Sequence, residues 1–236
     1  MKGILYIMAT PIGNMEDITL RALRILGEVD LLLAEDTRVT GKLLARHNIS
    51  VKMKSYHQRS ADSVATEIIA LLNEGKALAL VTDAGTPGVA DPGNELIARV
   101  IKEAPQVAIE PIPGASSLTS ALSVCGFPTN AFVFMGFLPH KKGRQTQLNH
   151  IQEEERTVVL FESPHRIGKL LAELEERAPD RPLAIFREIT KMHESHYRGT
   201  VKELHAQFTK GDMTQKGEYV VILGPSPKPI RAVAES

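Results

Sequence analysis

The residues best suited to bind a small molecule lie between Val81 and Gly93. This stretch contains three glycines, two prolines and two aspartates, and it follows an apolar run that begins at Ala77. Glycines allow sharp turns and let a ligand approach bare backbone, while the aspartates supply fixed carboxylates. Because ligands of open α/β sheets bind beyond the carboxyl ends of the strands, the pattern predicts a small-molecule site. A tight surface turn is the alternative interpretation.

Charged residues follow three other apolar runs directly. The segments are Glu35-Asp-Thr-Arg38, Glu162-Ser-Pro-His-Arg166 and 187–194, and the last contains Glu188 and Lys191. A carboxylate or a lysine in such a position can serve as a general base if its pKa suits the reaction. An arginine there either pairs with a neighbouring carboxylate or holds a phosphate, and both roles stay open at this point.

The elements that must position these residues alternate between apolar strands and helices. We predict strands over 3–9, 30–34, 77–81 and 106–110, separated by helices, one capped by Asp17 or Thr19 and another by Ser60. Strands that are apolar throughout are typical of a parallel sheet with both faces covered. The first half therefore predicts an α/β domain over residues 1–112.

The second half of the chain has a different spacing of predicted strands and helices. We predict strands over 132–135, 157–161, 183–186 and 218–223, with helices among them, in a C-terminal α/β domain of residues 113–224. Pro111 and Pro113 mark the boundary between the two domains. Residues 225–236 contain three prolines, so they are predicted to form a disordered tail.

Composition excludes several classes of protein. The chain has 236 residues, and its one cysteine, Cys125, excludes an internal disulfide and a Cys-rich metal site. This is typical of a reducing cytoplasm, and no metal is expected. No apolar run approaches the roughly 18 residues of a membrane span, so no membrane partner is expected. The sequence also lacks the P-loop and dinucleotide motifs, which predicts a ligand without a pyrophosphate.

Two stretches contain basic residues and no acidic ones, although the net charge of the chain is zero. The first, 37–61, holds Arg38, Lys42, Arg46, Lys52, Lys54 and Arg59, and the second, 135–152, holds Lys141, Lys142 and Arg144 with two histidines. Such stretches indicate a phosphate-bearing partner. A solvated surface is the alternative interpretation.

Taken together, the motifs at the strand ends resemble those of the ribosomal small-subunit RNA cytidine 2′-O-methyltransferases, within the tetrapyrrole (corrin/porphyrin) methylase superfamily. They occur in family order and cover about residues 4–224. They are Ala9-Thr-Pro-Ile-Gly-Asn14 with Asp17-Ile-Thr19, Glu35-Asp-Thr-Arg38, Thr82-Asp-Ala-Gly-Thr-Pro87, Asp91-Pro-Gly93, Pro113-Gly-Ala-Ser-Ser117, Gly136-Phe-Leu-Pro139, Glu162-Ser-Pro-His-Arg166, Glu188-Ile-Thr-Lys191 and Lys216-Gly-Glu218.

This resemblance implies an N-terminal parallel sheet, a C-terminal mixed sheet and S-adenosyl-L-methionine bound in a cleft between the two domains. It also implies a cytoplasmic homodimer that methylates the ribose 2′-hydroxyl of one decoding-centre cytidine in 16S rRNA. The Gly-rich first loop of the porphyrin methylases is replaced here by Thr10-Pro-Ile-Gly-Asn14, which argues against a tetrapyrrole substrate. Many family members carry a small domain after the last strand. Since a Pro-rich tail stands there in this chain, the RNA contacts of that domain are expected to be made elsewhere or to be missing.

By motif position, Gly85, Thr86 and Val89 are expected to line the methionine and sulfonium end of the methyl donor. Ser116 and Ser117 begin a helix, where free N–H groups suit a carboxylate, and simple capping is the alternative role. Further cofactor-binding candidates are Pro11, Asp83 and Phe161. Phe161 alternatively belongs to the core, and Asp83 alternatively fixes its own loop by accepting backbone N–H bonds.

A ribose hydroxyl is a poor nucleophile that profits from a general base. The candidates, in order, are Lys191, Glu188, Asp36 and Glu162. Lys191 fits this role only if desolvation lowers its pKa; otherwise it binds phosphate or polarises the hydroxyl. The residues expected to bind RNA are Arg38, Arg59, Lys141, Lys142, Arg144, Arg166 and Arg187. Aromatic residues make up 5% of the chain, so a shaped substrate such as the assembled 30S subunit is expected.

Two other functions stay open. A small-molecule methyltransferase of the same superfamily would act on a porphyrinoid and would not depend on RNA. A non-catalytic ribosome-assembly factor would bind the methionine-derived ligand without turnover.

Overall fold

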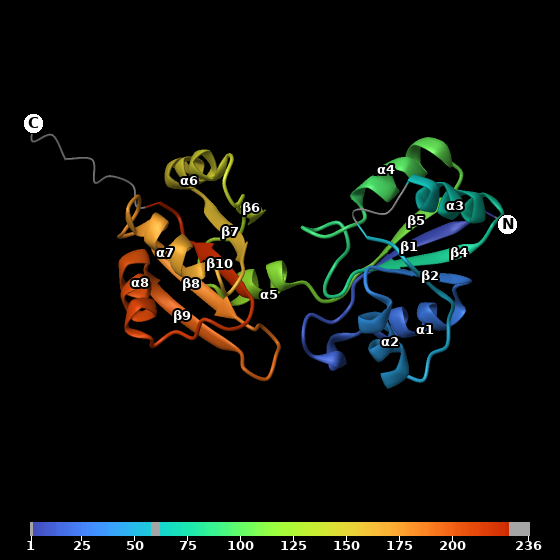
Figure 1. Ribbon diagram of the computed structural model, residues 1–236, viewed down its shortest axis with the longest axis horizontal. Helices are drawn as coiled ribbons and strands as arrows, with labels where there is room; N and C mark the ends of the chain where they lie inside the picture. Colours follow the sequence, from blue (N-terminus) through green and yellow to red (C-terminus); the bar gives the residue numbers. More distant parts are fainter. Residues whose placement is uncertain (1, 58–61, 227–236) are drawn as a thin grey trace, which may run out of the picture. The chain divides into compact units, whose positions relative to one another are not determined.

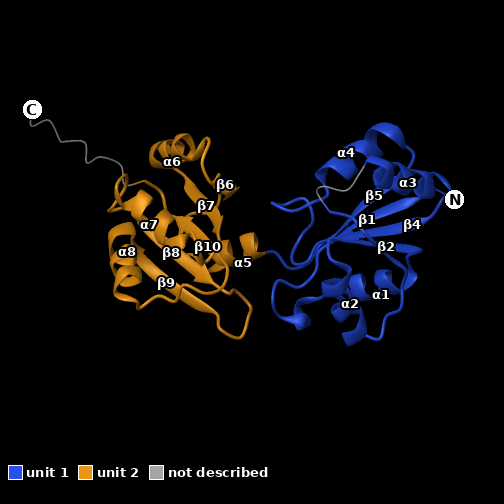
Figure 2. Cartoon of the chain, in the orientation of Figure 1, with its two compact units in different colours: residues 1–116 blue, residues 117–236 orange. Residues whose placement is uncertain are grey.

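The computed structural model describes residues 2–57 and 62–226, which divide into a first unit of residues 1–116 and a second of residues 117–236 (Figure 2). The division falls shortly after the boundary expected at residues 112 and 113. Of the expected tail, residues 227–236 lie outside the described part, as do Arg59 and the expected helix cap Ser60.

The first unit is a five-stranded, entirely parallel sheet in the order β3-β2-β4-β1-β5. This confirms the parallel sheet predicted from the apolar runs. Its strands and helices are β1 (Ile4–Met8), α1 (Leu20–Glu28), β2 (Leu31–Ala34), α2 (Thr37–Arg46), β3 (Met53–Ser55), α3 (Asp62–Asn73), β4 (Ala77–Val81), α4 (Asn94–Glu103) and β5 (Ala108–Ile112), with a 3₁₀ turn at Met15–Asp17.

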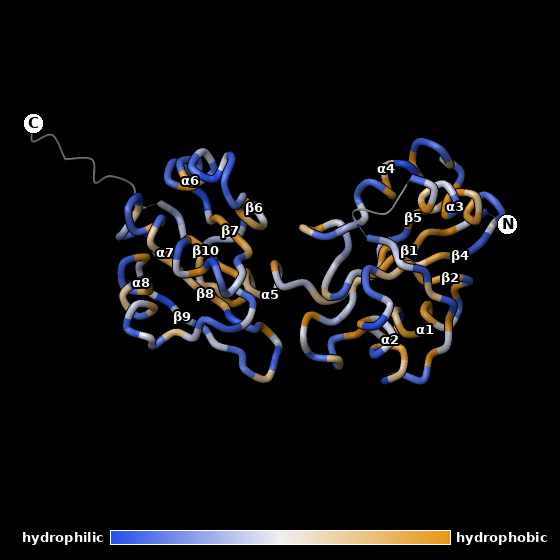
Figure 3. The backbone as a smooth tube through the Cα atoms, in the orientation of Figure 1, coloured by the Kyte–Doolittle hydropathy of each residue, from blue (hydrophilic) through white to orange (hydrophobic). Residues whose placement is uncertain are grey.

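Successive residues of the strands point to opposite faces of the sheet, and helices cover both. Leu78 and Leu80 of β4 pack with residues of α3 and α4, whereas Ala79 and Val81 pack with residues of α1 and α2. Figure 3 shows that the strands between these helices are strongly hydrophobic. The core therefore holds the strands rigidly, and all of them end in loops at one edge of the sheet.

The second unit is a mixed sheet in the order β6-β7-β10-β8-β9. Its elements are α5 (Ser117–Val124), β6 (Phe132–Phe137), α6 (Arg144–Glu153), β7 (Thr157–Glu162), α7 (Ile167–Glu175), β8 (Pro182–Arg187), β9 (Ser195–Thr200), α8 (Val201–Lys210) and β10 (Tyr219–Leu223). The pair β6–β7 is parallel, and the other pairs are antiparallel. The last strand, β10, is drawn in red between β7 and β8 in Figure 1.

Residues of α6, α7 and α8 pack on one face of this second sheet. There they form a core with alternate strand residues such as Leu160, Ile185 and Val221. Helix α5 contacts β10, and Arg198 of β9 donates a hydrogen bond from Nη2 to the carbonyl of Val124 at the end of α5 over 2.7 Å.

Candidate active site

Three loops at the carboxyl edge of the first sheet are tied together by backbone groups. Thr10, after β1, exchanges two hydrogen bonds with Gly85, after β4, with N···O distances of 2.9 and 3.1 Å. The Thr86 hydroxyl donates to the carbonyl of Ala115, after β5, over 3.3 Å. These bonds tie the stretch Val81–Gly93 to the loops after β1 and β5, at the edge where ligands of such sheets bind.

The loop after β2 joins the same group through carboxylates. The Asp36 N–H donates to Asp83 Oδ1 over 3.0 Å, and the Asp83 N–H donates to Glu35 Oε2 over 3.5 Å. The Asp83 carboxylate therefore fixes the loop after β2, whereas the alternative left open by the sequence was that it fixes its own loop. Asp83 is exposed while Glu35 and Asp36 are half-buried, so a cationic ligand group can reach the Asp83 carboxylate.

Gly85 is buried, and its backbone N–H and carbonyl are both bonded to Thr10. Gly85 has a φ of +79°, which favours glycine, and a Cβ placed on it would meet only Ile12, at 3.4 Å. Val89 is 36% exposed and offers an apolar surface nearby in the chain. Gly114 lies against Ala9, whose Cβ would be 3.1 Å from an added Cβ. The exposed Asp83 carboxylate and the apolar Val89 side chain match the needs of a ligand that carries a sulfonium.

The other residues expected to bind the methyl donor lie close to these loops in the sequence. Pro11 follows Thr10, and Ser116 follows Ala115. Ser117 begins α5 and is the first residue of the second unit.

Asp36 is a weak base. It caps α2 by accepting the Arg38 N–H over 2.8 Å, and the Arg38 guanidinium binds both of its oxygens. These bonds from Arg38 lower the pKa of Asp36 to about 2. A carboxylate held so firmly as an anion accepts a proton poorly near neutral pH. The Arg38 side chain is 88% exposed and is available to a ligand phosphate.

In the second unit, Lys191 lies in the turn between β8 and β9. Its Nζ donates to Glu188 Oε1 over 3.1 Å and to Glu218 Oε2 over 2.8 Å. Partial burial acts to lower the pKa of Lys191, but the bonds to Glu218 and Glu188 outweigh it and raise the pKa above its usual value. The ammonium is therefore retained. This direction opposes a lysine base and favours the other role considered for Lys191, binding phosphate or polarising the hydroxyl.

The same turn holds strained backbone. Glu188 and Thr190 have φ values of +52° and +64°, although neither is a glycine. Within the described residues, the buried Thr190 hydroxyl has no hydrogen-bond partner. Strain and unsatisfied groups of this kind cluster at functional sites. Glu188 itself is partly buried, which opposes ionisation, yet the Glu218 N–H and Lys191 lower its pKa.

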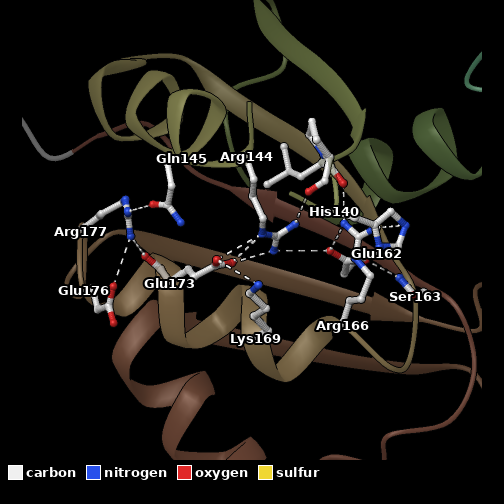
Figure 4. A network of polar contacts seen from close by, with 12 residues as sticks. His140, Arg144, Gln145, Glu162, Ser163, Arg166, Lys169, Glu173, Glu176 and Arg177 are labelled. Atoms are coloured by element: carbon white, nitrogen blue, oxygen red, sulfur yellow. Dashed lines mark hydrogen bonds and ion pairs between the residues drawn. The ribbon is translucent and has the colours of Figure 1, made fainter. Parts of the chain in front are cut away.

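Glu162 belongs to an internal ion network, shown in Figure 4. Its side chain is fully buried, and it pairs with Arg166 over 3.1 Å and with Arg144 over 4.0 Å. Arg144 is 3% exposed and binds Glu173 with an Nη2–Oε2 distance of 2.7 Å. Because its carboxylate is enclosed and paired, Glu162 is not positioned to act on a substrate, and we do not retain it as a general base.

The network also corrects the expected RNA contacts. The guanidinium groups of Arg144 and Arg166 bind buried carboxylates and backbone carbonyls. Arg187 is 8% exposed, and it donates to the carbonyls of Lys216 and His193. Of the strand-end arginines, Arg38 and Arg166 form the carboxylate pairs that were the other role considered for them, while Arg187 binds backbone carbonyls. Lys141 and Lys142 are exposed, and Arg59 lies outside the described residues.

Phe161 is partly buried on β7, where its ring meets those of two phenylalanines of β6. The centroid distances are 4.9 Å to Phe134 and 5.7 Å to Phe137, both edge to face. Phe137 is 54% exposed, so this aromatic cluster reaches the surface.

The sequence analysis missed three residues that complete these groups. Thr10 bridges to Gly85, Glu218 binds Lys191, and Glu173 neutralises Arg144. The motif Lys216-Gly-Glu218 was a signal for the second of them. Nothing in the sequence near Glu173 indicated its partner, which lies 29 residues away on another helix.

No cluster of three or more His, Cys, Asp or Glu side chains suited to a metal ion occurs among the residues that the structure describes. No helix within the same residues has the length and apolar character needed to span a membrane.

Comparison with known proteins adds direct information. The model of the family Tetrapyrrole (Corrin/Porphyrin) Methylases matches residues 4–205. The Ribosomal RNA small subunit methyltransferase I of Thermotoga maritima is 45% identical, over 94% of this chain and 98% of that protein. The protein of the same name from a Synechocystis species is 46% identical, over 96% of this chain and 81% of that protein.

Solved structures show the same fold. A uroporphyrin-III-C-methyltransferase from Thermus thermophilus has a TM-score of 0.63 at 24% identity, with 94% of both chains covered. A diphthine synthase has a TM-score of 0.70 at 14% identity, covering 94% of this chain and 89% of that one. At these identities the likeness concerns the fold alone.

Proposed function

Because this chain belongs to the tetrapyrrole (corrin/porphyrin) methylase family, we propose that it transfers a methyl group from S-adenosyl-L-methionine to 16S rRNA, at the 2′-hydroxyl of a cytidine ribose. One observation carries the proposal. Identity to a small-subunit rRNA methyltransferase is 45% and extends over nearly the whole of both chains. The strand-end motifs that suggested this reaction lie within the matched length.

The loops at the carboxyl edge of the first sheet would hold the methyl donor. Gly85 is fixed by its two bonds to Thr10, Thr86 is fixed by Ala115, and the Asp83 carboxylate is exposed. These groups suit a ligand with an amino-acid end and a positive sulfonium. When bound, S-adenosyl-L-methionine supplies an electrophilic methyl group. The role of the protein is to orient the reacting atoms and exclude water, which supplies much of the rate of such a transfer.

Lys191 would act on the acceptor as a cation. Held between Glu188 and Glu218, its ammonium can donate a hydrogen bond to the ribose oxygen and stabilise the negative charge that develops there. The hydroxyl proton must leave as the new oxygen–carbon bond forms. We infer that one of the two carboxylates at Lys191 Nζ accepts it, Glu188 Oε1 at 3.1 Å or Glu218 Oε2 at 2.8 Å.

The assembled 30S subunit is the proposed substrate, and the active form is a cytoplasmic homodimer. The shortage of aromatic residues, 5% of the chain with no tryptophan, supports recognition of a structured RNA surface over stacking on many single-stranded bases.

A labelling experiment separates this function from its competitors. The protein is incubated with tritiated S-adenosyl-L-methionine and either 30S subunits carrying unmodified rRNA, naked 16S rRNA or a porphyrinoid. Label in the rRNA, released as a 2′-O-methylated cytidine on digestion, supports the proposal. Label only in the porphyrinoid would overturn it. Tight donor binding without label in any substrate would instead favour an assembly factor.

Substitutions of Lys191 test its assigned role. Lys191→Ala should lower kcat by about 10²- to 10³-fold, as does the loss of one charge-stabilising donor in other enzymes. Lys191→Arg keeps the charge and should retain part of the activity. Equal inactivity of both variants would point to a base instead, and near-normal turnover of Lys191→Ala would remove the residue from the site. Lys76→Ala is the control, since Lys76 also pairs with a carboxylate, Asp30, but precedes β4.

A further inference from the structure

The buried Arg144 and the half-buried Arg166 hold four consecutive residues of the segment Leu138–Gly143, which we call the basic loop. Arg166 Nη2 donates to the carbonyl of Leu138 over 2.5 Å, and Arg166 Nη1 lies 3.2 Å from His140 Nε2. Arg144 Nη1 donates to the carbonyl of Pro139 over 3.2 Å, and its backbone N–H donates to that of Lys141 over 3.2 Å. The conformation of this surface loop is therefore determined from inside the unit (Figure 4).

The arginines are fixed in turn by buried carboxylates. Glu162 and Glu173 are 1% and 8% exposed, and between them they bind both guanidinium groups. Removing four charged groups from water costs much of what their pairing gains, so such a network is weak evidence for a contribution to stability. What this network specifically determines is the conformation of the basic loop.

The basic loop presents cations and hides its acceptors. The carbonyls of Leu138 and Pro139 are occupied by the arginines, while the side chains of His140, Lys141 and Lys142 are exposed. No carboxylate of the described residues forms an ion pair with either lysine, in agreement with the acid-free stretch 135–152. A rigid backbone with unpaired cations matches a partner with regularly spaced anions.

We propose that the basic loop is a preformed binding surface for the phosphates of structured RNA, and that Glu162, Arg166, Arg144 and Glu173 are its positioning residues. The proposal rests on the rRNA substrate argued above and names the part of the second unit that contacts it. The exposed ring of Phe137, directly before the loop, is placed to contact a ribose or base beside those phosphates.

Direct contact is tested with the double variant Lys141→Ala/Lys142→Ala. Binding to 30S subunits with unmodified rRNA is measured without donor over a series of KCl concentrations. We expect affinity to fall about tenfold or more, and the slope of log K against log salt to shrink by about 1 to 2, since each lost phosphate contact removes roughly 0.7 to 0.9. Lys202→Ala/Lys210→Ala, which removes two exposed lysines of α8, should change neither quantity.

Positioning is tested with both lysines in place. Arg166→Lys keeps a positive charge beside Glu162 but loses the fork that holds Leu138 and His140. It should weaken 30S binding and speed amide exchange across residues 139–143. Its control is Arg181→Lys. Arg181 is a buried arginine of the second unit that binds the backbone carbonyls of Gly224 and Arg156, and it does not contact the loop. Arg181→Lys should lower Tm without changing 30S binding by the folded protein.

The outcomes separate this inference from the proposed function. If Lys141→Ala/Lys142→Ala binds 30S subunits as tightly as the α8 control, the inference is overturned even where methyl transfer proceeds. If its binding to naked 16S rRNA is normal and only 30S binding falls, the loop contacts a ribosomal protein and the RNA proposal is overturned. If the variants behave as expected but no rRNA is methylated, the proposed function fails while the binding surface stands. Arg166→Lys with unchanged 30S binding would remove the positioning role.

Discussion

The two units place charged residues directly after their strands in the same way along the sequence, but they use them differently in space. After β2 and β4 the charged side chains of the first unit remain at the surface, and Arg38 is 88% exposed although it pairs with Asp36. After β7 and β8 the corresponding residues of the second unit turn inward, where Glu162 is 1% and Arg187 is 8% exposed. The first edge keeps its charges accessible to a ligand. The second uses Glu162 and Arg187 for internal order, while Lys191, in the turn after β8, stays 30% exposed.

The difference comes from what lies next to each strand end. In the first unit the neighbours are loops joined by backbone bonds, such as the Thr10–Gly85 bridge, which leave the side chains free of enclosure. In the second unit, α6 and α7 close over the end of β7, and each supplies a charged partner, Arg144 or Glu173, to the network around Glu162. A charged strand end is therefore evidence for a ligand site only where no neighbouring helix encloses it.

The largest expected effect is on stability, and it should divide the two regions. Arg144→Ala leaves Glu173 and Glu162 buried with too few partners, so the free energy of unfolding should fall by about 3 to 5 kcal/mol. Arg38→Ala, which breaks an exposed pair, should leave Tm nearly unchanged. Urea and thermal unfolding of both variants give the comparison. Similar losses in the two variants would show that exposure does not distinguish the regions.

An intermediate effect concerns the backbone of the donor loops. Gly85→Ala places a Cβ at a φ of +79°, and Gly211→Ala does the same at +86°, where a Cβ would meet no atom within 4 Å. Each should cost roughly 1 to 2 kcal/mol of stability, the penalty of a left-handed conformation. Only Gly85→Ala should also weaken binding of S-adenosyl-L-methionine, measured by calorimetry. Equal donor affinity in both variants would exclude the backbone of Gly85 from the donor site.

The smallest expected effect is a change in the pKa of Asp36. The Asp36 carboxyl, with a pKa of about 2 in the folded protein, has an unfolded value near 3.9. Because the folded value is depressed, its contribution to stability is complete above about pH 4 and is lost as the pH falls toward 2. In Arg38→Ala the pKa should rise part of the way back, since the backbone N–H of residue 38 remains. Carbon NMR of the carboxyl group measures this, and an unchanged pKa would assign the whole shift to backbone bonds.

Much of the fold could be predicted because the central strands are continuous apolar runs. The two strands that were missed, β3 and β9, are the outer strands of their sheets. Met53–Ser55 is short and largely exposed, and Ser195–Thr200 is polar, so neither carries the apolar signal of a buried strand. An edge strand is recognised by its hydrogen bonds to a neighbour, which the sequence does not display.

The candidate site was predicted unevenly for a related reason. The glycines and aspartates of Val81–Gly93 act through local backbone geometry, which residue type indicates well. Whether a charge is buried depends instead on a partner far along the chain, as with Arg144 and Glu173. The pKa of Lys191 shows the same limit, because its direction depends on Glu218, 27 residues away.

The central position of β10 in its sheet has a consequence for folding during translation. All strands of the first sheet have been synthesised by Ile112, so that unit can fold while the rest is still being translated. The second sheet cannot close in the same way, because β7 and β8 pair with Tyr219–Leu223 and not with each other. Until those five residues leave the ribosomal exit tunnel, the edges of two apolar strands stay unpaired on the nascent chain. This is the interval in which chaperones have most to protect.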